Sequence, residues 1–229
     1  MSAYDKTFIE IFALSAMDSA APGYARGMSK AERPDWQNFS GGIGLEVVQA
    51  INKHIGYTYS IANTYLGKSA SEIPARITTA FRGEMMFRYR KLFAPSDSRG
   101  PVNGTRHIRL ALESLRKKHE KLNSAGYSVF ERNELFVFLS FSANTRDVEL
   151  FLSGAARVSE SYEKTYSRII LFDKKSLFYV LPDSAAFEEH RFGDAVLYDL
   201  GKRVRKLREA SEWGDGTQYR SVLDTIEHR

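Results

Sequence analysis

A continuous apolar run in the middle of the chain constrains the fold more than any other feature. The run is Leu135-Phe136-Val137-Phe138-Leu139. Five apolar residues in succession are typical of a strand that is buried on both faces, because a strand with one solvated face alternates apolar and polar residues. Such a strand needs a layer of helices above and below its sheet. The run therefore predicts an α/β fold with a central mixed sheet flanked by helices.

Two short segments upstream of this run predict a β-hairpin. Residues 33–39 and 43–48 are separated by the small glycine-bearing turn Ser40-Gly41-Gly42. Asp35 stands at the head of the first segment and Glu46 lies inside the second, so pairing brings two carboxylates close together. Adjacent carboxylates repel, and a hard divalent cation is the usual reason for tolerating them. The alternative is ordinary turn chemistry at Asp35 and a Glu46 that faces solvent or pairs with an arginine.

Helices are predicted on both sides of this hairpin in the sequence. The spacing of apolar residues predicts one helix over 5–17 and a stronger one over 105–122, which carries a basic polar side. Residues 168–173 and 177–181 read as two strands joined by a turn, and residues 196–211 as a helix. We expect a single domain over 1–229, with a helical insertion at about 49–104 and a helical tail over 187–229.

The distribution of charge favours a polyanionic partner. The formal net charge is only +5, but cations concentrate in the middle third of the chain, where acidic residues are sparse. We expect four of these cations to contact nucleic acid, most simply DNA: Arg106, Arg109, Arg116 and Lys117. A second basic run, residues 202–208, is predicted to be a solvated face of a helix.

Several classes of function are excluded or disfavoured by composition. The chain contains no cysteine, which excludes disulfides, thiolate zinc sites and thiol nucleophiles. Its five histidines form no short-spaced pair suited to zinc and are predicted to lie on the surface. Gly67-Lys68-Ser69 lacks the upstream glycine of a phosphate-binding loop. No apolar run approaches the ~20 residues of a membrane span, so we expect a soluble cytoplasmic protein without a membrane partner.

The order of helix, acidic strand, acidic strand, basic helix and buried strand resembles the core of the PD-(D/E)XK nuclease-like superfamily. The resemblance covers roughly residues 5–140. Pro34-Asp35 matches its first acidic element, and Leu45-Glu46-Val47 matches the apolar-flanked second element. The resemblance implies a restriction-endonuclease-like core. One position departs from the pattern, because Val48 stands where the family has a lysine, and valine can neither orient a water nor stabilise a phosphate.

The resemblance implies a Mg²⁺-dependent DNA endonuclease, with Mn²⁺ as an alternative metal. Asp35 and Glu46 would hold the metal together with the main-chain carbonyl of Val47. A glutamate of the first helix often completes such sites, which nominates Glu10; the alternative is that Glu10 faces solvent. Restriction, repair and defence are the roles that fit such an activity, and a homodimer is compatible with it.

The lysine missing at Val48 has candidate replacements elsewhere, because the chemistry needs an ammonium group at a point in space rather than in sequence. Lys118 and Lys121 border the apolar face of the basic helix and are the first candidates. Lys117 and Lys53 are weaker ones. Val48 also favours a rival interpretation, in which the protein is a catalytically inactive nuclease fold that binds nucleic acid or another protein.

Overall fold

The computed structural model describes residues 6–50, 65, 68–80, 85–88, 91–95, 104–139, 142–173 and 175–211. The chain divides into two compact units. One comprises Met1–Asp5 with Ile51–Asn103, and the other comprises Lys6–Ala50 with Gly104–Arg229. The second, larger unit contains the hairpin, the basic helix and the central apolar run, so it carries every residue of the predicted metal site.

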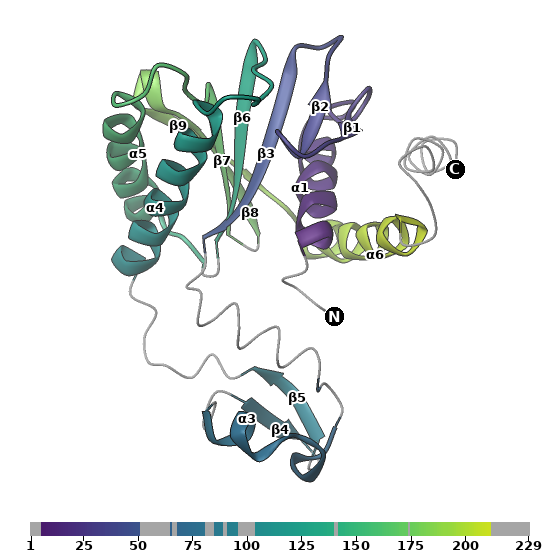
Figure 1. Ribbon diagram of the computed structural model, residues 1–229. Coiled ribbons are helices and arrows are strands. Elements are labelled where there is room, and N and C mark those ends of the chain that lie inside the picture. Colours follow the sequence, from purple (N-terminus) through teal and green to yellow (C-terminus); the bar gives the residue numbers. More distant parts are fainter. Residues whose placement is uncertain are drawn as a thin grey trace. The chain divides into compact units, whose positions relative to one another are not determined.

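A seven-stranded mixed sheet forms the centre of the larger unit (Figure 1). The strands lie side by side in chain order, and the parallel pairs are β3 with β6 and β6 with β7, whereas all other neighbours are antiparallel. The strands are β1 (Ser29–Lys30), β2 (Trp36–Asn38), β3 (Ile43–Ala50), β6 (Arg132–Leu139), β7 (Arg168–Phe172), β8 (Ser176–Leu181) and β9 (Ala186–Arg191). The predicted apolar strand β6 is therefore the central one.

Helices cover both faces of this sheet. Helices α1 (Lys6–Ala20) and α6 (Asp194–Ser211) pack on one face, and α4 (Gly104–Leu122) and α5 (Thr145–Ser159) pack on the other. In β6, Phe136 packs on the α1 side, whereas Leu135 and Val137 pack on the α4 side, and none of the three is exposed. The prediction of an α/β fold around a doubly buried central strand is confirmed. No helix in the described part of the chain is both long and apolar enough to span a bilayer.

The hairpin predicted at 33–48 is confirmed. Strand β2 runs antiparallel to β3, with Trp36 opposite Leu45. Asn38 shapes the turn between them, because its side-chain oxygen accepts a hydrogen bond from the main-chain nitrogen of Gly41 at 2.8 Å. Gly42 then adopts a positive φ of 61°, a conformation that favours glycine. The glycine-bearing turn thus fixes the register that sets Asp35 beside Glu46.

Gly44 provides a test of how tightly this hairpin is packed. A Cβ atom at this position would lie 2.6 Å from the ring of Phe130 and 2.8 Å from Cγ of Pro34. We expect Gly44→Ala to lower the free energy of unfolding by about 1–3 kcal/mol, because neither ring can move aside freely. Urea denaturation measures the change. Gly201→Ala in α6 is the control, since no described atom beyond its own stretch of helix backbone lies within 4 Å of its Cβ position, and it should be neutral or stabilising.

The smaller unit departs from the helical insertion predicted at about 49–104. It does contain a short 3₁₀ helix, η1 (Ala70–Glu72), and the helix α3 (Ala75–Ala80). It also contains an antiparallel pair of strands, β4 (Met85–Arg88) and β5 (Lys91–Pro95). Phenylalanines in both segments favour strands over helix. The predicted boundary at 49 is also early, because β3 continues to Ala50.

The predicted helical tail over 187–229 begins with a strand instead. Residues 186–191 form β9, which pairs with β8, and the helix α6 begins only at Asp194. The sequence of β9 is mostly polar because it is an edge strand with little burial. Main-chain pairing with β8 stabilises it, and polar composition does not reveal such pairing. Residues from 212 onward lie outside the described part.

Candidate active site

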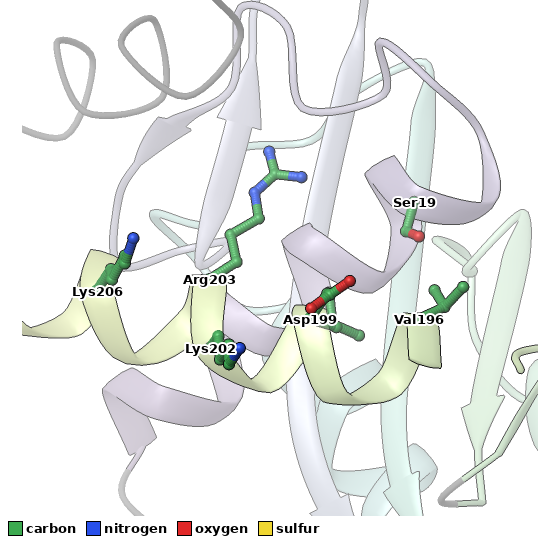
Figure 2. Close-up of a pocket in the computed structure, with 7 residues that line it drawn as sticks. Ser19, Val196, Asp199, Lys202, Arg203 and Lys206 are labelled. Carbon is green, nitrogen blue, oxygen red and sulfur yellow. The ribbon is translucent and has the colours of Figure 1, made fainter. Parts of the chain in front are cut away.

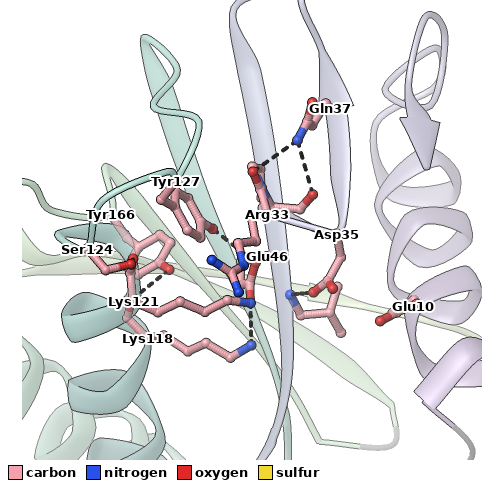
Figure 3. Close-up of polar contacts among 12 residues, drawn as sticks. Glu10, Arg33, Asp35, Gln37, Glu46, Lys118, Lys121, Ser124, Tyr127 and Tyr166 are labelled. Atoms are coloured by element: carbon pink, nitrogen blue, oxygen red, sulfur yellow. Dashed lines mark hydrogen bonds and ion pairs between the residues drawn. The ribbon is translucent and has the colours of Figure 1, made fainter. Parts of the chain in front are cut away.

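Asp35 and Glu46 lie on the two neighbouring arms of the hairpin, which forms part of the central sheet (Figure 3). Glu46 is in the interior of β3, beside Leu135 of β6, and is fully buried. Asp35 immediately precedes β2 and is 1% exposed. Its Oδ2 atom accepts a hydrogen bond of 2.8 Å from the main-chain nitrogen of Val47. The structure therefore brings all three predicted metal ligands onto adjacent segments.

Lys118 and Lys121 extend from α4 to the same carboxylate (Figure 3). The Nζ atoms of both residues contact Oε1 of Glu46, at 2.7 Å in the case of Lys121. A spacing of three residues places both lysines on the side of α4 that faces β3. Two ammonium groups thus lie beside Glu46, although β3 itself carries Val48 rather than a lysine two residues after Glu46.

Two tyrosines complete the surroundings of Glu46, and no sequence pattern indicated either of them. The hydroxyl of Tyr127 donates to Oε2 of Glu46 at 2.9 Å, and that of Tyr166 donates to the main-chain oxygen of Lys118 at 3.2 Å. Burial raises the pKa of both hydroxyl groups, and the charge of Glu46 raises it further. Both tyrosines therefore remain neutral hydrogen-bond donors.

The two carboxyl groups of the site titrate very differently. Burial raises the pKa of Asp35 to about 6, and the negative charge of Glu46 adds to this rise. Burial also acts to raise the pKa of Glu46, but the charges and hydrogen bonds of Lys118 and Lys121 outweigh it and lower the pKa. Pairs of carboxyl groups whose pKa values are pushed apart are typical of active sites.

The raised pKa of Asp35 predicts a dependence of stability on pH. A carboxyl group with a raised pKa in the folded state stabilises the fold at low pH, and this stabilisation is lost as pH rises through the folded pKa. A rise from 3.8 to about 6 corresponds to about 3 kcal/mol, lost between about pH 4 and pH 7. Chemical denaturation in EDTA should show this decline as a difference between the wild type and Asp35→Asn, because the lowered pKa of His119 acts in the opposite direction below about pH 6.5 in both proteins. Asp35→Asn should lack it, and parallel curves for the two proteins would contradict the prediction.

Glu10 of α1 is buried, so the alternative in which it faces solvent is wrong. It is 3% exposed, forms an ion pair with Lys30, and its main-chain oxygen accepts a hydrogen bond of 2.9 Å from Nε1 of Trp36. Its side chain points toward Asp35 (Figure 3), whose pKa its charge also raises. Packing of the hairpin against α1 covers this residue, an effect that the helical pattern alone does not predict.

The side chains at this position are of the chemical type that binds a hard cation. Carboxylate and carbonyl oxygens are the ligands that Mg²⁺ prefers, and Asp35 and Glu46 supply two carboxylates side by side. Among the described residues, no three aspartate, glutamate or histidine side chains are close enough to hold a metal ion together. A metal at this position therefore depends on main-chain oxygen, such as the carbonyl of Val47, and on solvent for its remaining ligands.

The four predicted nucleic-acid contacts lie along the exposed part of α4, and Lys117, four residues before Lys121, lies about 40° from it around the helix. All four are exposed, and Arg109 forms a surface ion pair of 3.8 Å with Glu113. With about 100° of rotation per residue, Arg116 lies roughly 160° and Lys117 roughly 100° from Lys118 around the helix. The structure therefore does not bring these cations together with the carboxylates. The four are Arg106, Arg109, Arg116 and Lys117.

His119 contradicts the prediction that the histidines are surface residues. It is fully buried, with Nδ1 at 3.1 Å from the main-chain oxygen of Leu115 and its ring stacked on Tyr162. Burial lowers its pKa. It lies on the buried face of α4 with Leu115 and Leu122, and its ring also contacts Tyr166. Lys53, His54 and His228 lie outside the described residues.

Another buried carboxylate, Glu134, was not indicated by the sequence. It lies at the start of β6, is 1% exposed, and accepts a hydrogen bond of 2.6 Å from the hydroxyl of Tyr24. Arg168 and Arg132 form ion pairs with it at 2.8 Å and 3.0 Å. Two arginines compensate this charge, so Glu134 has the surroundings of a structural ion pair rather than of a metal ligand.

Comparisons of the chain with protein-family models, with curated proteins and with solved structures found no match. The function must therefore be inferred from the geometry of the site. That geometry consists of two adjacent buried carboxylates, Asp35 and Glu46, with the ammonium groups of Lys118 and Lys121 beside the second.

Proposed function

We propose that this protein is a metal-dependent nuclease with a restriction-endonuclease-like core, which hydrolyses phosphodiester bonds in DNA. The observation that carries the proposal is the convergence of Lys118 and Lys121 on Glu46, next to Asp35. The order of elements also supports it: α1, then Asp35 at β2, then Glu46 in β3, then α4 crossing to the parallel strand β6. Cytoplasmic restriction, repair or defence is the setting that we propose.

Each residue of the site has a role in this proposal. Asp35 and Glu46 would hold Mg²⁺ or Mn²⁺ together with the main-chain carbonyl of Val47. The chemistry supplied by such a site would be polarisation of the scissile phosphate and a lowered pKa for a bound water molecule. Lys118 and Lys121 orient the Glu46 carboxylate and place positive charge where the phosphate gains negative charge during hydrolysis.

A binding module without catalysis is the second candidate, and one observation favours it. Both oxygens of Glu46 are already engaged, Oε1 by the two lysines and Oε2 by Tyr127. A fully engaged buried carboxylate is also what a purely structural ion-pair network contains. In that case the exposed cations of α4 would bind nucleic acid, and no bond would be cleaved.

A cleavage assay on supercoiled plasmid and on a single-stranded oligonucleotide separates the two candidates. The nuclease proposal expects products with Mg²⁺ or Mn²⁺ and none with EDTA. Fluorescence anisotropy in Ca²⁺ measures binding of the same substrates. Binding without cleavage under any metal would support the binding module instead, and neither binding nor cleavage would contradict both candidates.

A further inference from the structure

A cavity with three cations in its wall lies between α1 and α6, in the larger unit (Figure 2). Its volume is about 420 Å³. Among the described residues of the wall, the cations are Lys202, Arg203 and Lys206, the acidic residue is Asp199, and Ser19 and two apolar residues of α6 complete the lining. The size is within the range of small-ligand sites, and the wall carries a net positive charge.

The packing of α6 explains why these cations gather in one place. Leu200, Val204 and Leu207 are buried in the core that α6 shares with α1. Within the basic run 202–208, the helical period turns Val204 and Leu207 toward the core. Lys202, Arg203 and Lys206 lie at the border of this apolar side. The prediction that this run forms a solvated helix face is incomplete, because these three residues line a cavity.

Arg203 has hydrogen-bonding capacity that the described residues leave unused. Its Nη2 atom lies 3.4 Å from Oδ2 of Asp18, which is a long contact. Its Nε atom is buried and has no hydrogen-bond partner among the described residues. A guanidinium group carries five N–H donors, and buried donors without a partner are rare. The side chain is 24% exposed, so its remaining N–H groups can donate to an acceptor bound in the cavity.

An exposed aromatic ring stands next to these cations. Tyr198 is 61% exposed, and Nζ of Lys202 lies 4.3 Å from the centre of its ring. Arginine and lysine match the charge of a phosphate, and an exposed ring beside them offers a surface on which a nucleobase stacks. Free phosphate would use the cations alone. The combination fits a nucleic acid with an accessible base.

We propose that this cavity binds a backbone phosphate of a single-stranded nucleic-acid segment, with the adjoining base against Tyr198. The site is separate from the carboxylates, because α6 packs on the α1 face of the sheet whereas Lys118 and Lys121 approach Glu46 from α4 on the other face. The inference depends on the nucleic-acid partner named in the proposed function, but it does not depend on cleavage.

The test measures binding of a fluorescein-labelled single-stranded oligonucleotide by anisotropy in EDTA, over a range of salt concentrations. Each phosphate contact to a single strand contributes about 0.7 to the slope of log K against log salt concentration. Because the proposed site holds one backbone phosphate, the variant Lys202→Gln/Arg203→Gln/Lys206→Gln should lower the magnitude of this slope by about 0.7 and weaken binding at least about tenfold. Tyr198→Ala should weaken binding about tenfold and leave the slope unchanged.

A matched control removes the same charge elsewhere on the larger unit. Arg146, Arg157 and Arg191 are exposed and lie outside the cavity, and their triple replacement by glutamine should change the slope much less. The double variant Lys202→Gln/Lys206→Gln retains Arg203 and its contact with Asp18, so it guards against a folding defect. Thermal unfolding checks that each variant is folded.

Specific outcomes would overturn the inference. Equal losses of oligonucleotide affinity in the cavity variant and the control variant would mean that net charge alone causes the effect. Binding of inorganic phosphate or of anionic lipid vesicles at the cavity, with oligonucleotide binding unchanged in the variants, would assign the site to another ligand. The nuclease proposal can fail independently of this inference. In that case the wild-type protein would show no metal-dependent cleavage, while the cavity variant would still bind the oligonucleotide more weakly than the wild type.

Discussion

Asp35→Asn should lower the rate of Mg²⁺-dependent cleavage by about 10³-fold while leaving DNA binding in Ca²⁺ nearly unchanged. Holding a catalytic metal contributes several kcal/mol to transition-state stabilisation, and every 1.4 kcal/mol is about tenfold in rate. Asparagine keeps an oxygen that can accept the hydrogen bond from the main-chain nitrogen of Val47. The substitution therefore removes the charge and preserves the local geometry. Single-turnover cleavage of a labelled duplex measures the effect.

The control for this variant is Asp183→Asn, which removes one negative charge from an exposed position outside the site. It should cleave at the wild-type rate. The pKa of about 6 for Asp35 adds a second expectation, because a protonated carboxyl group binds cations poorly. Wild-type cleavage should rise with pH through about 6 at limiting metal concentration. A variant that cleaves as fast as the wild type would exclude Asp35 as a metal ligand.

The hairpin and the convergence on Glu46 were predictable because they depend on local patterns. A glycine-bearing turn between two short strands fixes the register that places Asp35 beside Glu46. The amphipathic period of α4 identifies the side on which Lys118 and Lys121 lie. Strand alternation and helical period are both set by the backbone, so a single sequence suffices to infer them.

The remaining features of the site come from contacts between segments far apart in the chain. Tyr127 lies 81 residues from the carboxylate to which it donates. It follows α4 in a loop, where no period constrains the direction of a side chain. The burial of Glu10 and His119 has the same origin, because a helical pattern indicates which face is apolar but not which segment covers its border. Strand β9 was missed because edge pairing with β8 does not require apolar residues.

Removing the two ammonium groups that contact Glu46 should have the largest effect on stability. We expect Lys118→Met/Lys121→Met to lower the free energy of unfolding by about 3–5 kcal/mol, the usual cost of leaving a buried charge without its partner. Glu46 is fully buried, and among the described residues the hydroxyl of Tyr127 is the remaining side-chain partner of its carboxylate in this variant. Methionine is similar in length to lysine and fills the same space, so packing is largely preserved. Chemical denaturation at pH 7 measures the loss.

A third substitution distinguishes loss of charge pairing from loss of packing. Adding Glu46→Gln to the double variant replaces the buried charge by a neutral group of nearly the same size, and should restore most of the lost stability. Lys117→Met is the control on the exposed side of α4 and should change the free energy of unfolding by no more than about 0.5 kcal/mol. A double variant as stable as the wild type would mean that Glu46 is not a buried charge paired with these lysines.

The single variants separate the part of the two lysines in stability from their part in catalysis. Lys118→Met leaves Lys121 in contact with Oε1 of Glu46, and Lys121→Met leaves Lys118 there. Each single variant should therefore remain folded. If an ammonium group at this position stabilises the phosphate during hydrolysis, at least one single variant should lose cleavage while retaining DNA binding in Ca²⁺. Full cleavage by both, together with the expected instability of the double variant, would assign Lys118 and Lys121 to the fold alone and would favour the binding module over the nuclease.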